Sequence, residues 1–291
     1  MKIKQVFVVG SGLMGNGIAQ VCAQSGINIK IYDVDIKSIE KAIQNITWSV
    51  RKLLEKGKIE GSLEAIMNRI QVAKGYEDCS NADLAIEAVF ENFQVKKEVF
   101  SKLDSTAPFH CLLASNTSAI PITELASCTS RPENVLGLHF FSPVPMMQAV
   151  EVIRGAATSD ETFSAGREFV ETIGKEPIMV HQDVPGFLIN RINFKANMEA
   201  MRLVESGVGT VEDIDKGLRL AAGRKMGIFE IGDMVGLDVT YGALIATYEE
   251  TKDPSWYPPQ ILRRKVKAGH LGRKTGKGWY EYNAEGKRSD H

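Results

Sequence analysis

A glycine-rich turn between an apolar run and a helical pattern constrains the fold of this chain more than any other feature. The apolar run at residues 6–9 is typical of a buried strand, and the sequence GSGLMG follows it at residues 10–15. A helical pattern at residues 16–24 comes next, and a second apolar run at residues 29–32 ends at Asp33. Strand, helix and strand in this order predict a βαβ unit and therefore a parallel sheet.

The turn has the GxGxxG spacing that lets a backbone approach a pyrophosphate and leaves a helix N-terminus facing that anion. We expect the contacts of this turn to a dinucleotide to come from Gly10, Gly12, Leu13, Met14 and Gly15. Asp33 follows the second strand, where it can bind a ribose 2′-hydroxyl, and together with Asp35 it would repel a 2′-phosphate. The motif therefore predicts a Rossmann-like domain that prefers NAD over NADP, and its context argues against a glycine turn without a ligand.

The first part of the chain continues to alternate strands and helices. Apolar residues spaced by three and four over residues 36–53, and a shorter set at 62–70, predict a helical hairpin that projects from the sheet, with Asp35 and Ser62 as N-caps. Further strands are expected at residues 70–73, 84–87, 112–115, 135–141, 149–153 and 177–180. The turn-rich segment SPVP after Phe141 predicts that two of these strands form a hairpin.

The pattern becomes almost entirely helical after a boundary at residues 182–186, beginning with a helix at residues 187–204. Thr210 and Asp213 resemble a capping box, and more helices are expected over residues 228–250. A glycine-rich, basic tail then follows. This part of the chain therefore differs in class from the strands and helices that precede it.

Length and composition agree with two globular domains, because 291 residues correspond to about two units of roughly 150 residues. We place an α/β domain with a mostly parallel Rossmann-like sheet and the helical-hairpin insertion at residues 1–183, and an all-α domain at residues 184–291. A hydrophobic share of 44% excludes disorder, and no apolar run reaches the roughly 18 residues of a membrane span. The formal net charge of −1 argues against a nucleic-acid binder, which normally carries a basic excess.

The cysteines and the first residues of the chain bear on its location. The four cysteines lie far apart without CxxC spacing, which is typical of reduced thiols and argues against a zinc site: Cys22, Cys79, Cys111 and Cys128. The apolar run after Lys4 is too short for a signal peptide. We therefore expect a cytoplasmic protein that binds no metal, nucleic acid or membrane.

A histidine and a glutamate on the two strands of the expected hairpin are candidates for acid–base chemistry. Histidine is the usual general base near neutral pH, although His139 among leucine and phenylalanine could equally be a core residue. Glu151 stands among apolar neighbours, where a carboxylate needs a partner, unless its position on the strand is an exposed one. A carboxylate bonded to one ring nitrogen makes the other more basic, so the hairpin favours the pairing of these two residues.

Other polar residues also follow strands. The segment SNTS offers Asn116 and Ser118 after one strand, although a polar loop or a helix cap would look the same. In an open α/β sheet, ligands bind outside the carboxyl ends of the strands. Several candidates are expected to converge at this edge: Gly10, Asp33, Glu87, Ser115 and His139.

A basic helix face carries Ser49, Lys52 and Lys56 at helical spacing. Such a face could hold a phosphate, but most faces of this kind are only solvated, and the sequence pattern favours that simpler interpretation.

Segments along nearly the whole chain resemble the short-chain L-3-hydroxyacyl-CoA dehydrogenase family, most of all its bacterial 3-hydroxybutyryl-CoA dehydrogenases. They are VVGSGLMGNGIAQ, EAVFEN, SNTSAIPIT, GLHFFSPVPMMQAVEVI, DVPGFLINR and GRKTGKGWY. Their order and spacing make the resemblance specific, since related β-hydroxyacid dehydrogenases are expected to use a lysine base and to lack HFFSPVP.

The resemblance implies roles for individual residues. His139 matches the catalytic base, Glu151 its carboxylate partner, and Ser118 and Asn190 residues that hydrogen-bond the substrate. Besides the fingerprint and Asp33, the expected dinucleotide contacts are Glu91, Lys96, Asn116 and Lys274. The expected coenzyme A contacts on the basic helix face are Ser49, Lys52 and Lys56, which reverses the interpretation of that face.

The resemblance further implies a reversible oxidation of a 3-hydroxyacyl-CoA by NAD⁺, in a homodimer formed largely through residues 184–291, with the substrate between the two domains. Two alternatives remain open. One is an NAD oxidoreductase acting on a free hydroxy acid, similar to L-gulonate dehydrogenase. The other is a crystallin-like or NAD-sensing protein without turnover.

Overall fold

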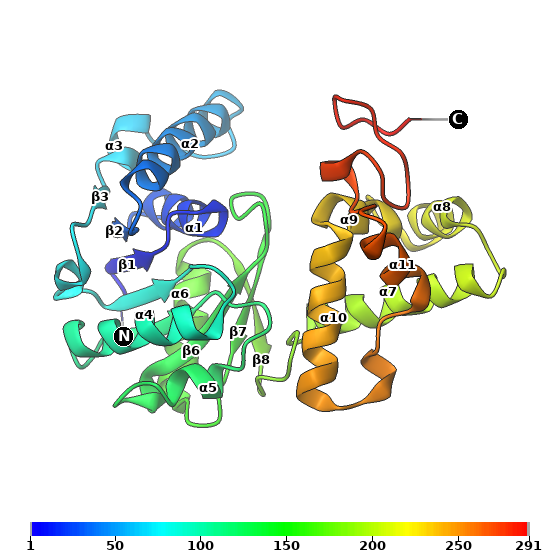
Figure 1. Ribbon diagram of the computed structural model, residues 1–291. Helices are drawn as coiled ribbons and strands as arrows, with labels where there is room; N and C mark the ends of the chain where they lie inside the picture. The colour runs from blue at the N-terminus through cyan, green and yellow to red at the C-terminus, as the bar shows by residue number, and fades with distance from the viewer. Residues whose placement is uncertain (1, 290–291) are drawn as a thin grey trace. The chain divides into compact units, whose positions relative to one another are not determined.

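The computed structural model describes residues 2–289 and divides into two compact units, one up to Phe187 and one from Leu188 on (Figure 1). This division lies four residues beyond the boundary that the sequence suggests. No helix in the described part of the chain is long and apolar enough to cross a membrane.

The first unit is built on one eight-stranded sheet in the order β3-β2-β1-β4-β5-β6-β7-β8. Its strands are β1 Gln5–Val9, β2 Asn28–Tyr32, β3 Ile70–Val72, β4 Leu84–Glu87, β5 Leu112–Ser115, β6 Val135–Phe140, β7 Ala149–Ile153 and β8 Glu176–Val180. The pairs are parallel except for β6 and β7, which run antiparallel as the predicted hairpin requires. The mostly parallel sheet of the Rossmann-like prediction is confirmed.

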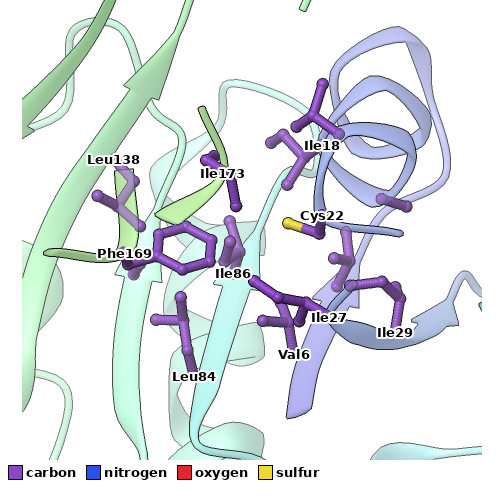
Figure 2. Packing of buried hydrophobic residues seen from close by; sticks show 14 of the residues in the cluster. Val6, Ile18, Cys22, Ile27, Ile29, Leu84, Ile86, Leu138, Phe169 and Ile173 are labelled. Carbon is purple, nitrogen blue, oxygen red and sulfur yellow. The ribbon is translucent and has the colours of Figure 1, made fainter. Parts of the chain in front are cut away.

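Two layers of helices bury the two faces of the sheet. The helices of this unit are α1 Leu13–Gln24, α2 Ile36–Glu55, α3 Leu63–Met67, α4 Phe93–Thr106, α5 Ile122–Ala126 and α6 Asp160–Thr172. Helices α1, α2 and α6 share one core with the sheet, and α4 and α5 share the other. Figure 2 shows Phe169 of α6 beside Leu138 of β6, and Ile18 and Cys22 of α1 in the same core.

The predicted helical hairpin is present, but it does not stand clear of the rest of the unit. Asp35 caps α2 through the amide of Lys37, and Ser62 caps α3 through the amide of Ala65, as predicted. Ile46 and its buried neighbours on α2 belong to the core that also contains α1. The apolar stripe that predicts the helix is therefore the face by which it packs.

Helix α4 is an element that the sequence analysis did not predict. Its buried residues are Lys96, Val99, Phe100 and Leu103, which have helical spacing. A lysine at the first of these positions interrupts the apolar pattern, because lysine is almost never fully buried without a partner. Lys96 has such partners, since carboxylate oxygens of Glu87 and Glu91 lie 2.6 and 3.2 Å from its ammonium.

The second unit is helical, in agreement with the predicted fold class. It contains α7 Ile189–Glu205, α8 Val211–Ala222, α9 Ile228–Val235, α10 Leu237–Thr251 and α11 Gln260–Lys267. Phe187 has a positive φ of 47°, so helix α7 begins after it and not at it. Thr210 accepts a hydrogen bond from the amide of Asp213 and so caps α8, but the Asp213 carboxylate accepts from the hydroxyl of Thr210, so only the N-cap half of the predicted capping box is present.

The glycine-rich tail of this unit folds onto α9. Buried Asp233 accepts hydrogen bonds from the amides of Trp279 and Tyr280 and from the hydroxyl of Tyr282. Gly272 lies so close to this aspartate that a Cβ would stand 2.3 Å from its carbonyl oxygen. The glycines and aromatic residues of the tail therefore have a packing role in this unit.

Candidate active site

The glycine turn brings β1 and α1 into close contact. Gly10 has a φ of +101°, and a Cβ on Gly15 would stand 1.8 Å from the Gly10 carbonyl oxygen. A Cβ on Gly12 would instead meet nothing within 4 Å, so the backbone there faces open space. Gly12 is also the N-cap of α1 and gives that helix no side-chain cap. The first amides of α1 are thus available to an anion, which suits a pyrophosphate.

Asp33 is fixed at the end of β2 by the turn itself. Its Oδ2 accepts hydrogen bonds from the amide and the hydroxyl of Ser11, at 2.7 and 2.8 Å, and its Oδ1 accepts one from the amide of Asp35 at 3.0 Å. A carboxylate has about four acceptor positions, so Asp33 can accept one more hydroxyl donor. Asp35 uses its own carboxylate to cap α2, through Lys37 and Ser38.

A cavity of about 550 Å³ lies beside this turn. Its lining includes the fingerprint residues Gly10, Gly12, Leu13 and Met14, the acids Asp33, Asp35 and Glu98, and the aromatic rings of Tyr32 and Tyr76. Backbone donors, a fixed acidic acceptor and apolar walls are what the adenosine and pyrophosphate of a dinucleotide need.

His139 and Glu151 face each other across β6 and β7, where the strand register pairs the two residues directly. Nδ1 of His139 lies 2.7 Å from Oε2 of Glu151. Glu151 is fully buried and His139 is 6% exposed, with the rings of Phe141 and Phe187 beside the imidazole. A carboxylate at Nδ1 favours the tautomer with the proton there, so Nε2 is the basic nitrogen.

A second cavity, of about 340 Å³, gathers side chains from several strand ends. Its polar lining residues are Glu91, Lys96, Asn116, Ser118, His139 and Ser142. Asn116 accepts a hydrogen bond from the amide of Phe140, which ties the segment after β5 to β6. Since β5 and β6 are parallel, the polar residues that follow β5 and the end of β6 lie at one edge of the sheet. Of the five residues expected to converge there, His139 lines this cavity, Gly10 and Asp33 line the other one, and Glu87 and Ser115 are buried.

Glu91 organises the turn that carries Ser118. Its Oε1 accepts hydrogen bonds from the hydroxyl of Thr117 at 2.6 Å, from the amide of Ser118 at 2.9 Å and from the amide of Ala119 at 3.1 Å. Burial alone would raise the pKa of Glu91, but the ammonium of Lys96 and these donors outweigh burial and lower it below its ordinary value. Glu91 is therefore an anion that holds the turn in place.

Glu87 and Lys96 form a buried ion pair behind this turn, with 2.6 Å between Nζ and Oε1 and almost no exposure of either side chain. Lys96 also contacts Glu91 at 3.2 Å, and Ser115 donates its hydroxyl to Glu87 at 2.6 Å. Glu87 was expected at this edge of the sheet, but its pairing with Lys96 was not predicted. The sequence gives only part of the signal: an acid at the end of an apolar strand needs a nearby cation if that acid is buried, but the sequence does not identify this cation as Lys96.

Two of the predicted site residues, Asn190 and Lys274, belong to the second unit. Asn190 lies in the first turn of α7. Lys274 lies in a short 3-10 helix, Arg273–Thr275, and forms an ion pair of 2.6 Å with Asp238 at the start of α10.

The predicted coenzyme A residues all lie near the end of α2. Lys52 pairs with Glu55 at 2.8 Å, and Lys56 is the exposed C-cap of the helix. Ser49 is half-buried one turn before Lys52. The face is accessible and basic, as a phosphate site requires.

Comparison with known proteins agrees with this geometry. Residues 5–184 match the family described as 3-hydroxyacyl-CoA dehydrogenase, NAD binding domain, and residues 186–282 match the C-terminal domain of the same enzymes. The chain belongs to the 3-hydroxyacyl-CoA dehydrogenase family. Its cofactor is NAD, and the glycine turn, the fixed carboxylate of Asp33 and the cavity beside them fit that cofactor.

Several members of the 3-hydroxyacyl-CoA dehydrogenase family are similar over nearly their full length. A probable 3-hydroxybutyryl-CoA dehydrogenase of Bacillus subtilis is 41% identical over 97% of this chain and 98% of its own. The mitochondrial hydroxyacyl-coenzyme A dehydrogenase of Mus musculus is 39% identical over 96% of this chain and 91% of its own. The crystal structure of (S)-3-hydroxybutyryl-CoA dehydrogenase from Ralstonia eutropha superposes with a TM-score of 0.93 at 38% identity, covering 97% of this chain and all of the other.

Proposed function

We propose that this dehydrogenase interconverts (S)-3-hydroxybutyryl-CoA and acetoacetyl-CoA with NAD(H), and that His139 is its acid–base catalyst. The observation that carries the proposal is the contact between His139 and buried Glu151 beside a cavity that Ser118 and Asn116 also line. The names of the relatives from Bacillus subtilis and Ralstonia eutropha support the four-carbon acyl group.

In the oxidative direction, Nε2 of His139 takes the proton of the 3-hydroxyl while the C3–H bond breaks. Bound NAD⁺ supplies the acceptor for the hydride. Removal of the proton builds negative charge on the oxygen, which helps to expel the hydride from C3. Glu151 then stabilises the imidazolium across the 2.7 Å contact at Nδ1. In the reductive direction the imidazolium returns its proton to the new alkoxide.

The substrate is held by groups outside the pair. We assign Ser118 to a hydrogen bond with the substrate oxygen, because Glu91 fixes the turn on which this serine stands. Asn190 is assigned a second hydrogen bond, from the family resemblance. Proton transfer by a positioned histidine contributes roughly 10²–10⁴-fold to the rate, and the positioning of reactants contributes further.

We assign the coenzyme A end of the substrate to the basic face of α2. Lys56 is an exposed cation at the end of the helix, and Lys52 and Ser49 precede it on the same face. A free hydroxy acid would need no such face, so these residues argue against that alternative.

We also infer a cytoplasmic homodimer that assembles through the helical unit. The inference comes from the family resemblance and from the free cysteines, which include buried Cys22, Cys79 and Cys111. Light scattering coupled to size-exclusion chromatography tests it, since a monomer at micromolar concentration would contradict the dimer.

The decisive assay follows the consumption of NADH and NADPH in parallel with acetoacetyl-CoA as the oxidant. We expect turnover with NADH well above turnover with NADPH. Protein that binds NADH but reduces no acetoacetyl-CoA would direct attention to the free hydroxy acid alternative, and then to a protein without turnover.

A further inference from the structure

The buried charges at the carboxyl edge of β4 do not cancel. Glu87, Lys96 and Glu91 form a chain of contacts in which one ammonium lies between two carboxylates, at 2.6 Å and 3.2 Å. Two negative charges against one positive charge leave a net charge of −1. Ser115 and the amide of Val89 complete the hydrogen bonds of Glu87.

This cluster borders the cavity that contains His139. Glu91 and Lys96 line the cavity directly, and Glu87 lies behind them, fully buried. Glu151 supports the imidazole of His139, which lines the same cavity. Two separate carboxylate sites therefore act near this cavity, and charges at buried sites act on one another more strongly than charges in water.

The proposed reaction moves one positive charge between two groups. Before oxidation the nicotinamide ring of NAD⁺ is positive and His139 is neutral. Hydride then leaves C3 for the ring and the hydroxyl proton goes to His139, so that the ring is neutral and the imidazole is positive. Both groups must reach C3 and its oxygen, so both charges develop in the cavity that His139 lines.

We infer that the Glu87–Lys96–Glu91 cluster is the counter-charge of the oxidised nicotinamide, as Glu151 is the counter-charge of the imidazolium. The cluster then raises the affinity for NAD⁺ relative to NADH, in addition to its packing role. Glu87 is a positioning residue in this scheme, because it acts through Lys96 and Glu91 and does not line the cavity. The inference rests on the proposed function for the place of the reaction.

The test measures the dissociation constants of NAD⁺ and NADH in the absence of substrate, by NADH fluorescence and by competition. Glu87→Gln brings the net charge of the cluster to zero. We expect the ratio of the NAD⁺ constant to the NADH constant to rise on the order of tenfold, the size of one unit charge acting over several ångströms at a partly buried site. If Glu87→Gln does not fold, Glu91→Gln makes the same change of charge at a more exposed side chain.

A double variant separates charge from packing. Glu87→Gln combined with Lys96→Met restores the net charge of −1 through Glu91 alone, at a pH high enough to keep Glu91 ionised without the ammonium of Lys96. At that pH the ratio should return toward the wild-type value. If the cluster has only a structural role, the ratio in the double variant should be no closer to the wild-type value than the ratio in the single variant. Glu98→Gln is the control for the change of charge and should leave the ratio unchanged. Glu98 lies on α4, as Lys96 does, but it lines the 550 Å³ cavity assigned to the adenosine and pyrophosphate, which NAD⁺ and NADH share.

A higher ratio in Glu87→Gln that falls again in the double variant supports the inference. An unchanged ratio in the single variant overturns it, and so does a raised ratio that the double variant keeps. A failure of the inference can be told apart from a failure of the proposed function, because the dissociation constants require binding and no turnover.

Discussion

His139 lies directly opposite Glu151 in the antiparallel register of β6 and β7, and main-chain hydrogen bonds between the strands hold the two side chains within 2.7 Å. Because Glu151 is fully buried, its charge acts on the imidazole with little screening by water. The register of the two strands therefore determines the pairing of His139 with Glu151, and each residue can be substituted on its own.

Replacing His139 with glutamine should lower kcat by roughly 10²–10⁴-fold with a modest change in KM, because proton transfer is lost while the shape of the side chain is largely kept. Steady-state reduction of acetoacetyl-CoA gives both constants. Glu151→Gln keeps a hydrogen-bonding group at Nδ1 but removes the charge, and should also lower kcat. Turnover near that of the wild type in the histidine variant would remove His139 from the role of base.

Asp33→Ala should weaken NADH binding and improve NADPH binding relative to it, since the carboxylate that repels a 2′-phosphate is removed. Loss of the two Ser11 bonds should loosen the turn and affect both cofactors. Asp35→Ser keeps the cap of α2 while removing one charge, so it measures the share of Asp35 in the repulsion of a 2′-phosphate and should change the preference less than Asp33→Ala. Dissociation constants for both cofactors give the result, and an unchanged preference would mean that Asp33 does not contact the ribose.

Lys56→Ala should raise KM for acetoacetyl-CoA but not for the truncated pantetheine thioester, because only the complete coenzyme carries the 3′-phosphate. Lys41→Ala, near the other end of the same helix, is the control and should leave both KM values unchanged. Equal effects of Lys56→Ala on the two substrates would place the phosphate elsewhere.

Glu91 should make the stability of the first unit depend on pH. Its pKa is lowered in the folded protein, so its stabilising effect is complete above the pKa of the unfolded chain, near 4.5, and is lost as the pH falls through the lower folded value. Urea denaturation of the wild type and of Glu91→Gln should differ at pH 7 and converge in acid. A difference that stays constant with pH would contradict an ionised Glu91 in the folded state.

Arg131 should be one of the most sensitive positions for stability. It is almost fully buried, pairs with Asp104 at 2.9 Å, and donates to the carbonyls of Asp104, Ala107 and Pro108 at the end of α4. Arg131→Ala leaves these acceptors and the carboxylate without their donor, which should lower the free energy of unfolding by about 3–5 kcal/mol. Arg131→Lys should recover only part of this loss, because lysine lacks the planar fork. A loss below 1 kcal/mol in the alanine variant would show that water replaces the guanidinium.

The predictable parts of the site are those that local pattern determines. Gly10 and Gly15 follow from the strand and helix around them, and the pairing of His139 with Glu151 follows from a hairpin with a turn-rich centre. The contact of Lys96 with Glu87 could not be predicted in the same way. Glu87 ends β4, and Lys96 lies in α4, a helix whose apolar pattern this lysine interrupts. A buried charge can be explained only when its partner has been located.

The antiparallel register of β6 and β7 also makes the acid–base pair depend on the connection between the two strands. Residues 141–148 form this connection, and they are anchored, because Val144 is buried in the core that contains α1 and Lys175 donates a hydrogen bond to the carbonyl of Met147. A change in the length of the connection would therefore shift the strand register and carry His139 away from Glu151.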